Sequence, residues 1–200
     1  MKNKKQIIFI HGGDGFRDPE KLYTMLRSRN FNPYQEKKYW REAVIAATTE
    51  THECHTLKMP NPNWADYTAW SIWFEKMVPY MRDEVVLVGH SLGGGFLLRY
   101  VSENKLPVPI AQLHLVAPVV TGDLEDCEDF TTDLAVWQGF KSEIKEVHLW
   151  HSSDDPYVPI AHSEALLAAW PKATLHSFTN RGHFIGEDFP ELLTAIQRVV

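Results

Sequence analysis

The sequence has little of what disulfide-stapled, membrane-spanning or nucleic-acid-binding proteins are made of. Only Cys54 and Cys127 among its 200 residues are cysteines, too few for a disulfide framework, so a reducing compartment is the default expectation. No stretch approaches the roughly 18 consecutive apolar residues of a membrane-spanning helix. Basic residues are outnumbered, with 20 Lys plus Arg against 26 Asp plus Glu, so nucleic acid is not expected as a partner.

Other absences concern targeting and domain organisation. The lysine-rich start of the chain is followed by an apolar run at residues 7–10, which is too short for the apolar part of a secretion signal. The sequence has no internal repeat, low-complexity tract or linker. Apolar residues make up 44% and charged residues 23%, as in an ordinary globular protein. We therefore expect a cytoplasmic protein with a single domain over residues 1–200 and no membrane segment.

Short apolar runs alternate with longer segments of helical periodicity. The expected strands are 6–11, 51–59, 85–88, 111–117, 147–152 and 173–178, and the expected helices are 18–29, 34–49, 64–80, 92–103, 160–170 and 189–200. This alternation predicts an α/β fold with a mostly parallel central sheet of about six strands and helices on both faces. Residues 118–139 interrupt this alternation of strands and helices and are expected to form a short excursion near the functional site.

A candidate nucleophile follows the third expected strand. Residues 89–93 read Gly-His-Ser-Leu-Gly, a G-x-S-x-G pattern that lies directly between an apolar run and a helical segment. Such a sharp strand-to-helix turn exposes the Ser91 hydroxyl above the sheet and leaves no room for Cβ atoms at Gly89 and Gly93. The start of the following helix favours developing negative charge.

A serine hydroxyl needs a base, and the base needs an orienting carboxylate. In this architecture the chain order is serine, then acid, then histidine. Residues 152–159, just past an expected strand, offer Asp154 and Asp155 as the acid. We favour Asp155, because Pro156 holds it in an extended conformation at the end of the strand. Asp154 is the alternative, with a turn or cap as its ordinary role.

Ten histidines compete for the role of base. We favour His183, the one that follows a glycine in a loop after a strand, at the sheet edge where open α/β sheets bind ligands. His90 adjoins the serine, but neighbours on so tight a turn point apart. His52 and His55 flank a cysteine with no further ligand nearby, so strand histidines are favoured over a metal site, and no metal is expected. The remaining histidines fall at positions 11, 114, 148, 151, 162 and 176.

The attacked carbonyl becomes an oxyanion that needs two aimed N–H donors. We expect the backbone of Leu92, directly after the nucleophile, and the backbone of Gly13 in the glycine-rich loop after the first strand. A plain glycine turn is the alternative interpretation of that loop.

The motifs together resemble the α/β-hydrolase family. Ile-Phe-Ile-His-Gly-Gly, Val-Gly-His-Ser-Leu-Gly-Gly, Asp-Asp-Pro-Tyr-Val-Pro and Gly-His-Phe occur in the family's order across nearly the whole chain. The small size is similar to the compact serine hydrolases of the retinoblastoma-binding-protein and YdeN types. The resemblance implies a catalytic triad of Ser91, Asp155 and His183, and carboxylester-type hydrolysis. Residues 18–30 depart from the family pattern as an extra helix at the entrance.

The sequence thus predicts a cofactor-free serine hydrolase with little or no cap, which cleaves a small ester, thioester or amide through an acyl-enzyme on Ser91. Two alternatives stay open: an acyltransferase, and a non-catalytic binding module on a hydrolase scaffold. The acidic run at residues 123–133 is interpreted as a solvated loop. The alternative places it near the mouth of the site, where it would disfavour anionic substrates.

Overall fold

The computed structural model describes residues 4–35, 38–140 and 143–198. Within these ranges six strands form one sheet in the order β2-β1-β3-β4-β5-β6, and every neighbouring pair is parallel. The strands are β1 (Lys5–Ile10), β2 (His52–Leu57), β3 (Val85–His90), β4 (Ile110–Val116), β5 (Ile144–Ser152) and β6 (Thr174–Phe178). The parallel α/β sheet predicted from the sequence is confirmed.

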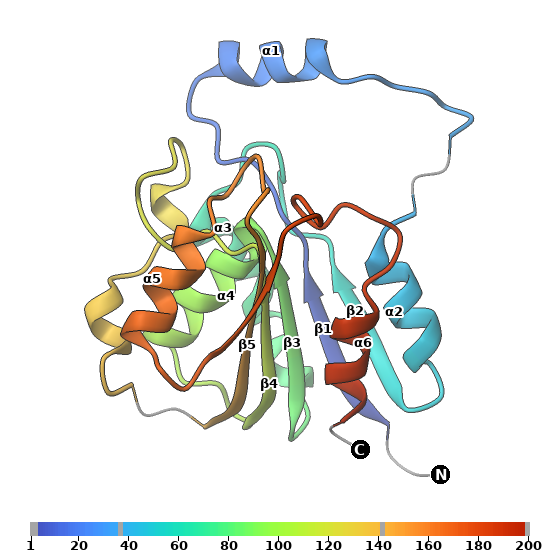
Figure 1. Ribbon diagram of the computed structural model, residues 1–200, viewed down its shortest axis with the longest axis vertical. Helices are drawn as coiled ribbons and strands as arrows, with labels where there is room; N and C mark the ends of the chain where they lie inside the picture. The colour runs from blue at the N-terminus through green and yellow to red at the C-terminus, as the bar shows by residue number, and fades with distance from the viewer. Residues whose placement is uncertain (1–3, 36–37, 141–142, 199–200) are drawn as a thin grey trace.

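Helices cover both faces of the sheet (Figure 1). The α-helices are α1 (Pro19–Ser28), α2 (Trp40–Thr48), α3 (Tyr67–Glu75), α4 (Leu92–Glu103), α5 (Ala161–Ala169) and α6 (Pro190–Gln197). The short 3₁₀ helices are η1 (Val78–Tyr80), η2 (Glu128–Phe130) and η3 (Leu134–Trp137). Helices α3, α4 and α5 pack on one face and α2 and α6 on the other, as the connections of parallel strands require.

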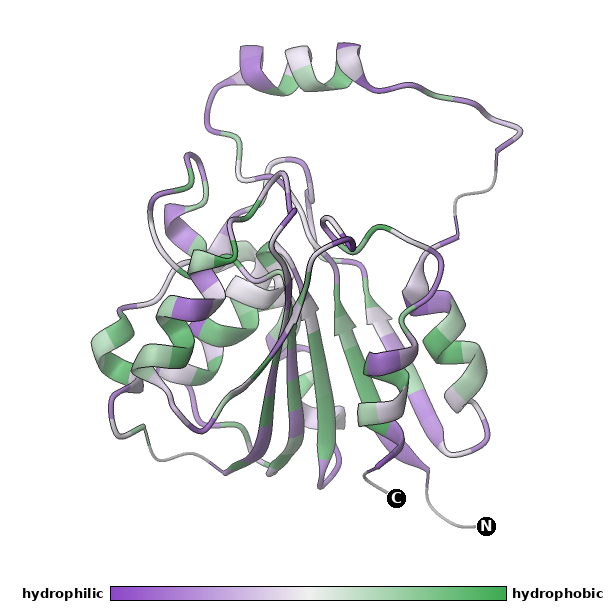
Figure 2. Ribbon diagram, viewed as in Figure 1, coloured by the Kyte–Doolittle hydropathy of each residue, from purple (hydrophilic) through white to green (hydrophobic). Residues whose placement is uncertain are grey.

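The two-residue period of the strands divides the core into two layers. Along β1 and β3, Ile8 and Leu87 join the cluster under α3, α4 and α5, whereas Ile7 and Val86 join the cluster under α2 and α6. All four side chains are fully buried. Figure 2 shows the corresponding hydrophobic colour along the central strands. Burial on both faces explains why these strands read as continuous apolar runs.

Two helices are shorter than their periodicity predicts. The helix expected at residues 34–49 begins only at Trp40, where Tyr39 is the N-cap and its N–H donates to the Glu42 carboxylate at 3.0 Å. Before it, the Asn32 side chain accepts the Tyr34 N–H at 3.0 Å in a turn. Residues 36–37 of that expected helix lie outside the described residues. The helix expected at 64–80 ends at Glu75, since Pro79 has no N–H to continue it.

Helix α1 stands apart from the rest of the fold. It has Asp18 as its N-cap and Pro19 in its first turn, as its sequence predicts, yet none of its residues is buried. It crosses above the carboxyl ends of the strands (Figure 1). Its N-terminal part is tied to the segment 118–139: Lys21 pairs with Asp126 at 3.0 Å and also with Glu125. Ion pairs therefore connect the acidic segment to the N-terminal part of α1.

Cys54 and Cys127 are both free thiols. Across the ranges that the structure describes, no helix combines the length and the apolar character needed to cross a membrane.

Candidate active site

The turn between β3 and α4 holds Ser91 in an unusual conformation. Its backbone has φ 55° and ψ −121°, a region that costs a non-glycine residue of the order of 1–3 kcal/mol. Several backbone hydrogen bonds hold the residue there. The Ser91 N–H donates to the carbonyl of Val116 at 2.8 Å, and the Ser91 carbonyl accepts from the Gly94 N–H at 2.9 Å. The strand-to-helix turn predicted from G-x-S-x-G is therefore present, with the serine at its tip.

The two glycines of the motif are required by close backbone contacts. A Cβ atom on Gly89 would lie 2.5 Å from the carbonyl oxygen of Gly93. A Cβ atom on Gly93 would lie 2.6 Å from the carbonyl oxygen of Ile10 and still closer to that of His11. Both clashes involve backbone, which cannot move without distorting β1 or the turn.

We expect Gly93→Ala to lower the free energy of unfolding by about 2–3 kcal/mol, because the new methyl group overpacks the junction of β1 and α4. Gly122→Ala is the matched control, since a Cβ atom there meets nothing within 4 Å. Its stability is expected to stay within about 0.5 kcal/mol of the wild type. Urea unfolding measures both, and equal stabilities of the two variants would contradict the packing argument.

Asp155 and His183 form a hydrogen-bonded pair. The His183 Nδ1–H donates to Asp155 Oδ2 at 2.7 Å, and the carboxylate is fully buried while the imidazole is nearly so. The other carboxylate oxygen, Oδ1, accepts the N–H groups of Tyr157 at 2.8 Å and Val158 at 3.0 Å. Burial alone would raise the pKa of Asp155, but these hydrogen bonds outweigh it and hold the pKa below its usual value. The His183 imidazole is thus hydrogen-bonded to an ionised Asp155 carboxylate.

Asp154, the alternative acid, does not contact the imidazole. Its Oδ1 accepts the Gly182 N–H at 3.0 Å and the hydroxyl of Ser152. The same hydroxyl oxygen accepts the Arg181 N–H at 3.1 Å. Asp154 therefore fixes the loop that carries the neighbouring histidine, a role that its position next to Asp155 did not predict.

The backbone N–H groups of Gly13 and Leu92 are the two donors expected for an oxyanion. In the described part of the chain neither donates to another backbone carbonyl. Leu92 is the first residue of α4, where the helix dipole favours negative charge. The glycine loop is held by His11, whose Nε2 accepts the Met59 N–H at 2.9 Å and whose Nδ1–H donates to the Gly12 carbonyl at 2.6 Å.

A cavity of about 800 Å³ lies at the carboxyl edge of the sheet. Ser91, His183 and Gly13 all line it, and Met25 of α1 lines it from above. No hydrogen bond joins Ser91 Oγ to the imidazole among the described residues. Ser91 and His183 thus border the same cavity. Catalytic hydrogen bonds of this kind are often long or poorly aligned before substrate binds.

His90 has a role that the sequence analysis missed. Its Nε2–H donates to the carbonyl of His183 at 2.8 Å, and the two rings lie 4.8 Å apart. The Trp40 ring also packs edge-on against the His90 ring, with 6.1 Å between the ring centroids. Burial, together with the neighbouring His183 ring, lowers the pKa of His90 to about 3. As a neutral imidazole, His90 thus donates a hydrogen bond to the backbone of His183, the candidate base. No sequence motif predicts this contact.

The low pKa of His90 makes stability depend on pH. In the unfolded chain its pKa is near 6.5, so at pH 5 the unfolded state binds a proton that the folded state does not. Stability is therefore lost as the pH falls from 7 to 5, by about 1–2 kcal/mol from this group. We expect His90→Gln, which keeps an N–H donor, to flatten the pH dependence of urea unfolding by that amount. An unchanged slope would contradict this account.

Other histidines lie away from the cavity. His114, His148 and His176 form a row across β4, β5 and β6, with the Nδ1 of His148 3.1 Å from the Nε2 of His176. His52 and His55 lie on β2. Within residues 4–35, 38–140 and 143–198, no group of three or more His, Cys, Asp or Glu side chains has the arrangement of a metal site.

The family follows from the comparison with known proteins. The family model described as "Serine hydrolase" matches residues 33–190, well over half of the chain. The chain belongs to the serine hydrolase family. This serine hydrolase is 26% identical to "Serine hydrolase RBBP9" of Rattus norvegicus over 152 residues, which are 74% of this chain and 78% of the relative. It is 24% identical to "Putative hydrolase YdeN" of Bacillus subtilis over 186 residues, 92% and 88% of the two chains. The predicted RBBP9/YdeN type is confirmed.

Solved structures confirm the α/β-hydrolase fold of this serine hydrolase. The ydeN gene product of B. subtilis superimposes with a TM-score of 0.75 at 20% identity, covering 98% of both chains. A lipase-esterase related protein from Clostridium acetobutylicum superimposes with a TM-score of 0.65 at 12% identity, covering 100% of this chain and 96% of the other. The family match begins at residue 33, so α1 lies before the matched range.

Proposed function

We propose that this serine hydrolase cleaves a small carboxylic ester through an acyl-enzyme on Ser91, with His183 as base and Asp155 as its orienting acid. The observation that carries the proposal is the 2.7 Å hydrogen bond from His183 Nδ1 to a fully buried carboxylate, in a cavity that Ser91 also lines. An imidazole held this way by Nδ1 leaves Nε2 unprotonated for the serine proton. Thioesters and amides share the same carbonyl chemistry.

In the first half of the reaction, Ser91 Oγ attacks the carbonyl carbon while His183 Nε2 takes the hydroxyl proton. The carbonyl oxygen becomes an oxyanion, and the backbone N–H groups of Gly13 and Leu92 are the donors that bind it. Asp155 stabilises the imidazolium through Nδ1–H. The imidazolium then gives its proton to the ester oxygen, the carbon–oxygen bond breaks, and the alcohol leaves.

The second half repeats the first with water as the nucleophile. His183 takes a proton from water, whose oxygen attacks the acyl carbon, and the same two N–H groups bind the oxyanion. The bond from the acyl carbon to Ser91 Oγ then breaks as His183 returns the proton to the serine. The products are a carboxylic acid and the free enzyme.

A fluorophosphonate probe tests the proposal directly, because it forms a phosphonyl adduct only with an activated serine. We expect one adduct on the full-length protein, located on Ser91 by mass spectrometry of the peptides. Hydrolysis of p-nitrophenyl acetate should stop as labelling reaches completion. A protein that stays unlabelled and does not cleave the ester would contradict the proposal and favour a binding module.

A further inference from the structure

Helix α1 is an amphipathic segment whose apolar side chains are at most partly buried in the fold. Leu22, Met25 and Leu26 recur at helical spacing, yet no residue of the helix is buried. A ten-residue helix in water is marginal by itself, so its apolar side chains need a covering surface. Figure 2 shows hydrophobic and hydrophilic residues side by side along it. The fold therefore leaves the apolar stripe only partly covered.

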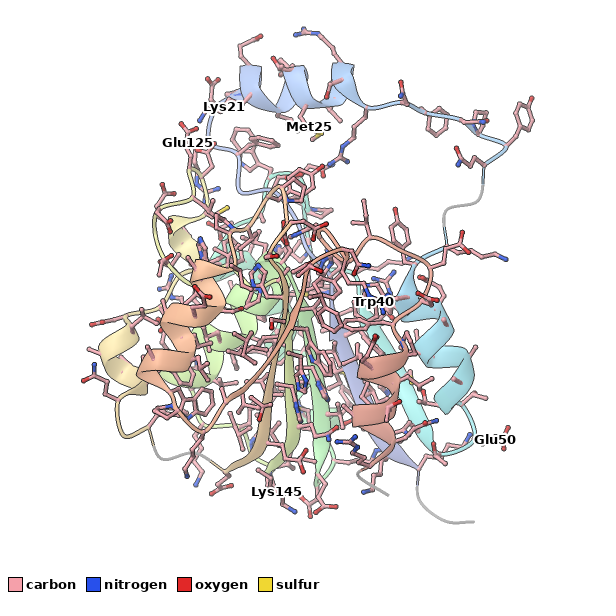
Figure 3. The ribbon with its side chains drawn as sticks, viewed as in Figure 1. Lys21, Met25, Trp40, Glu50, Glu125 and Lys145 are labelled. Atoms are coloured by element: carbon pink, nitrogen blue, oxygen red, sulfur yellow. The ribbon has the colours of Figure 1, made fainter. Side chains whose placement is uncertain are left out.

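One residue of the apolar stripe, Met25, lines the cavity, and Leu22 and Leu26 are not part of its lining. Met25 lines the same cavity as Ser91, and Figure 3 shows its side chain directed from α1 toward the body of the protein. On the body side, Leu124 and Val119 line the cavity, and both belong to the segment 118–139. Apolar side chains of two separate segments therefore border the space beside the candidate nucleophile.

The charged side chains around the cavity already neutralise one another. Arg29 and Asp14 line it and pair at 3.4 Å. Arg41 lines it and pairs with Glu42 at 2.9 Å, while Glu125 pairs with Lys21 of α1. A charged group on a substrate would have to compete with one of these pairs, whereas an uncharged chain would not. The cavity is therefore suited to a neutral apolar group.

Two exposed large apolar side chains line the same cavity. Tyr157 and Ile185 are 65% and 61% exposed. An apolar ligand in the cavity would contact such side chains.

We propose that α1 forms the outer wall of a binding site for an apolar acyl chain, which lies between Met25 and Leu124 with its carbonyl carbon at Ser91. This inference rests on the proposed function and adds the substrate class: neutral esters of medium-chain carboxylic acids. Met25 is a specificity-determining residue in this arrangement. Of the residues that define this site, Met25 precedes the family match, whereas Ser91 and Leu124 lie within it.

The test compares kcat/KM for p-nitrophenyl octanoate and p-nitrophenyl acetate. Each buried methylene group is worth about fourfold in affinity, so the wild type should prefer the octanoate by more than tenfold. Met25→Glu should lower this octanoate-to-acetate ratio at least tenfold, because a carboxylate then faces the acyl chain. Thr24→Glu adds the same charge one residue earlier at an exposed position and should leave the ratio within twofold. Met25→Leu should preserve the preference.

A wild-type ratio near one, or equal ratios in Met25→Glu and Thr24→Glu, would overturn the inference while fluorophosphonate labelling of Ser91 still supported the hydrolase. Absence of labelling from the wild type would overturn the proposed function and this inference with it.

Discussion

Ser91→Ala is expected to lower kcat for p-nitrophenyl acetate by about 10⁴–10⁶-fold, which corresponds to roughly 5–8 kcal/mol of activation free energy. The variant keeps the cavity, the backbone N–H groups of Gly13 and Leu92 and the pair of His183 with Asp155, but has no atom that can form the acyl-enzyme. The remaining rate then comes from binding and oxyanion stabilisation alone.

Ser102→Ala is the matched control for this experiment. It removes a hydroxyl from the same helix, α4, at the end remote from the cavity, where that hydroxyl donates to the Arg99 carbonyl at 2.7 Å. Its kcat is expected to stay within about twofold of the wild type. If Ser91→Ala retained activity within tenfold of the wild type, another group would have to be the nucleophile.

The sequence predicts the fold well because local pattern and long-range packing agree there. Strands β1 and β3 are buried on both faces, so their apolar runs leave no second interpretation. The strand-to-helix turn at Ser91 is equally predictable, since the contacts that exclude a Cβ atom at Gly89 involve residues within the same turn. Helix starts are less predictable: α2 begins where the Tyr39 N–H donates to the Glu42 carboxylate, and apolar periodicity does not report this hydrogen bond.

The surroundings of the site depend on contacts between distant segments, and these escaped prediction. His90 supports His183 across 93 positions, and Lys21 of α1 meets Asp126 across 105. Neither contact has a spacing that a motif could encode. The same holds for α1, whose sequence predicts a helix but not that Met25 would line the cavity. Sequence patterns thus predict the candidate reacting groups, while the structure shows the contacts that surround them.

Asp155→Asn is expected to lower kcat by about 10⁴-fold by reversing a hydrogen bond. In the wild type, Oδ1 accepts the N–H groups of Tyr157 and Val158, and Oδ2 accepts the Nδ1–H of His183. An asparagine has one oxygen, and the two backbone donors keep it at the Oδ1 position. Its NH₂ group then faces His183 Nδ1 and donates to it. The proton moves to Nε2, where the imidazole can no longer accept a proton from Ser91.

Asp154→Asn makes the same chemical change one residue earlier and separates a catalytic effect from a structural one. Asp154 Oδ1 accepts the Gly182 N–H at 3.0 Å, and an amide oxygen accepts this bond as well. We therefore expect a loss of kcat of less than about tenfold, through small shifts of the loop before His183. Steady-state kinetics on p-nitrophenyl acetate measures both variants. If Asp154→Asn were the more damaging, the acid that orients the base would be Asp154, and the hydrogen bond at Asp155 would have only a structural role.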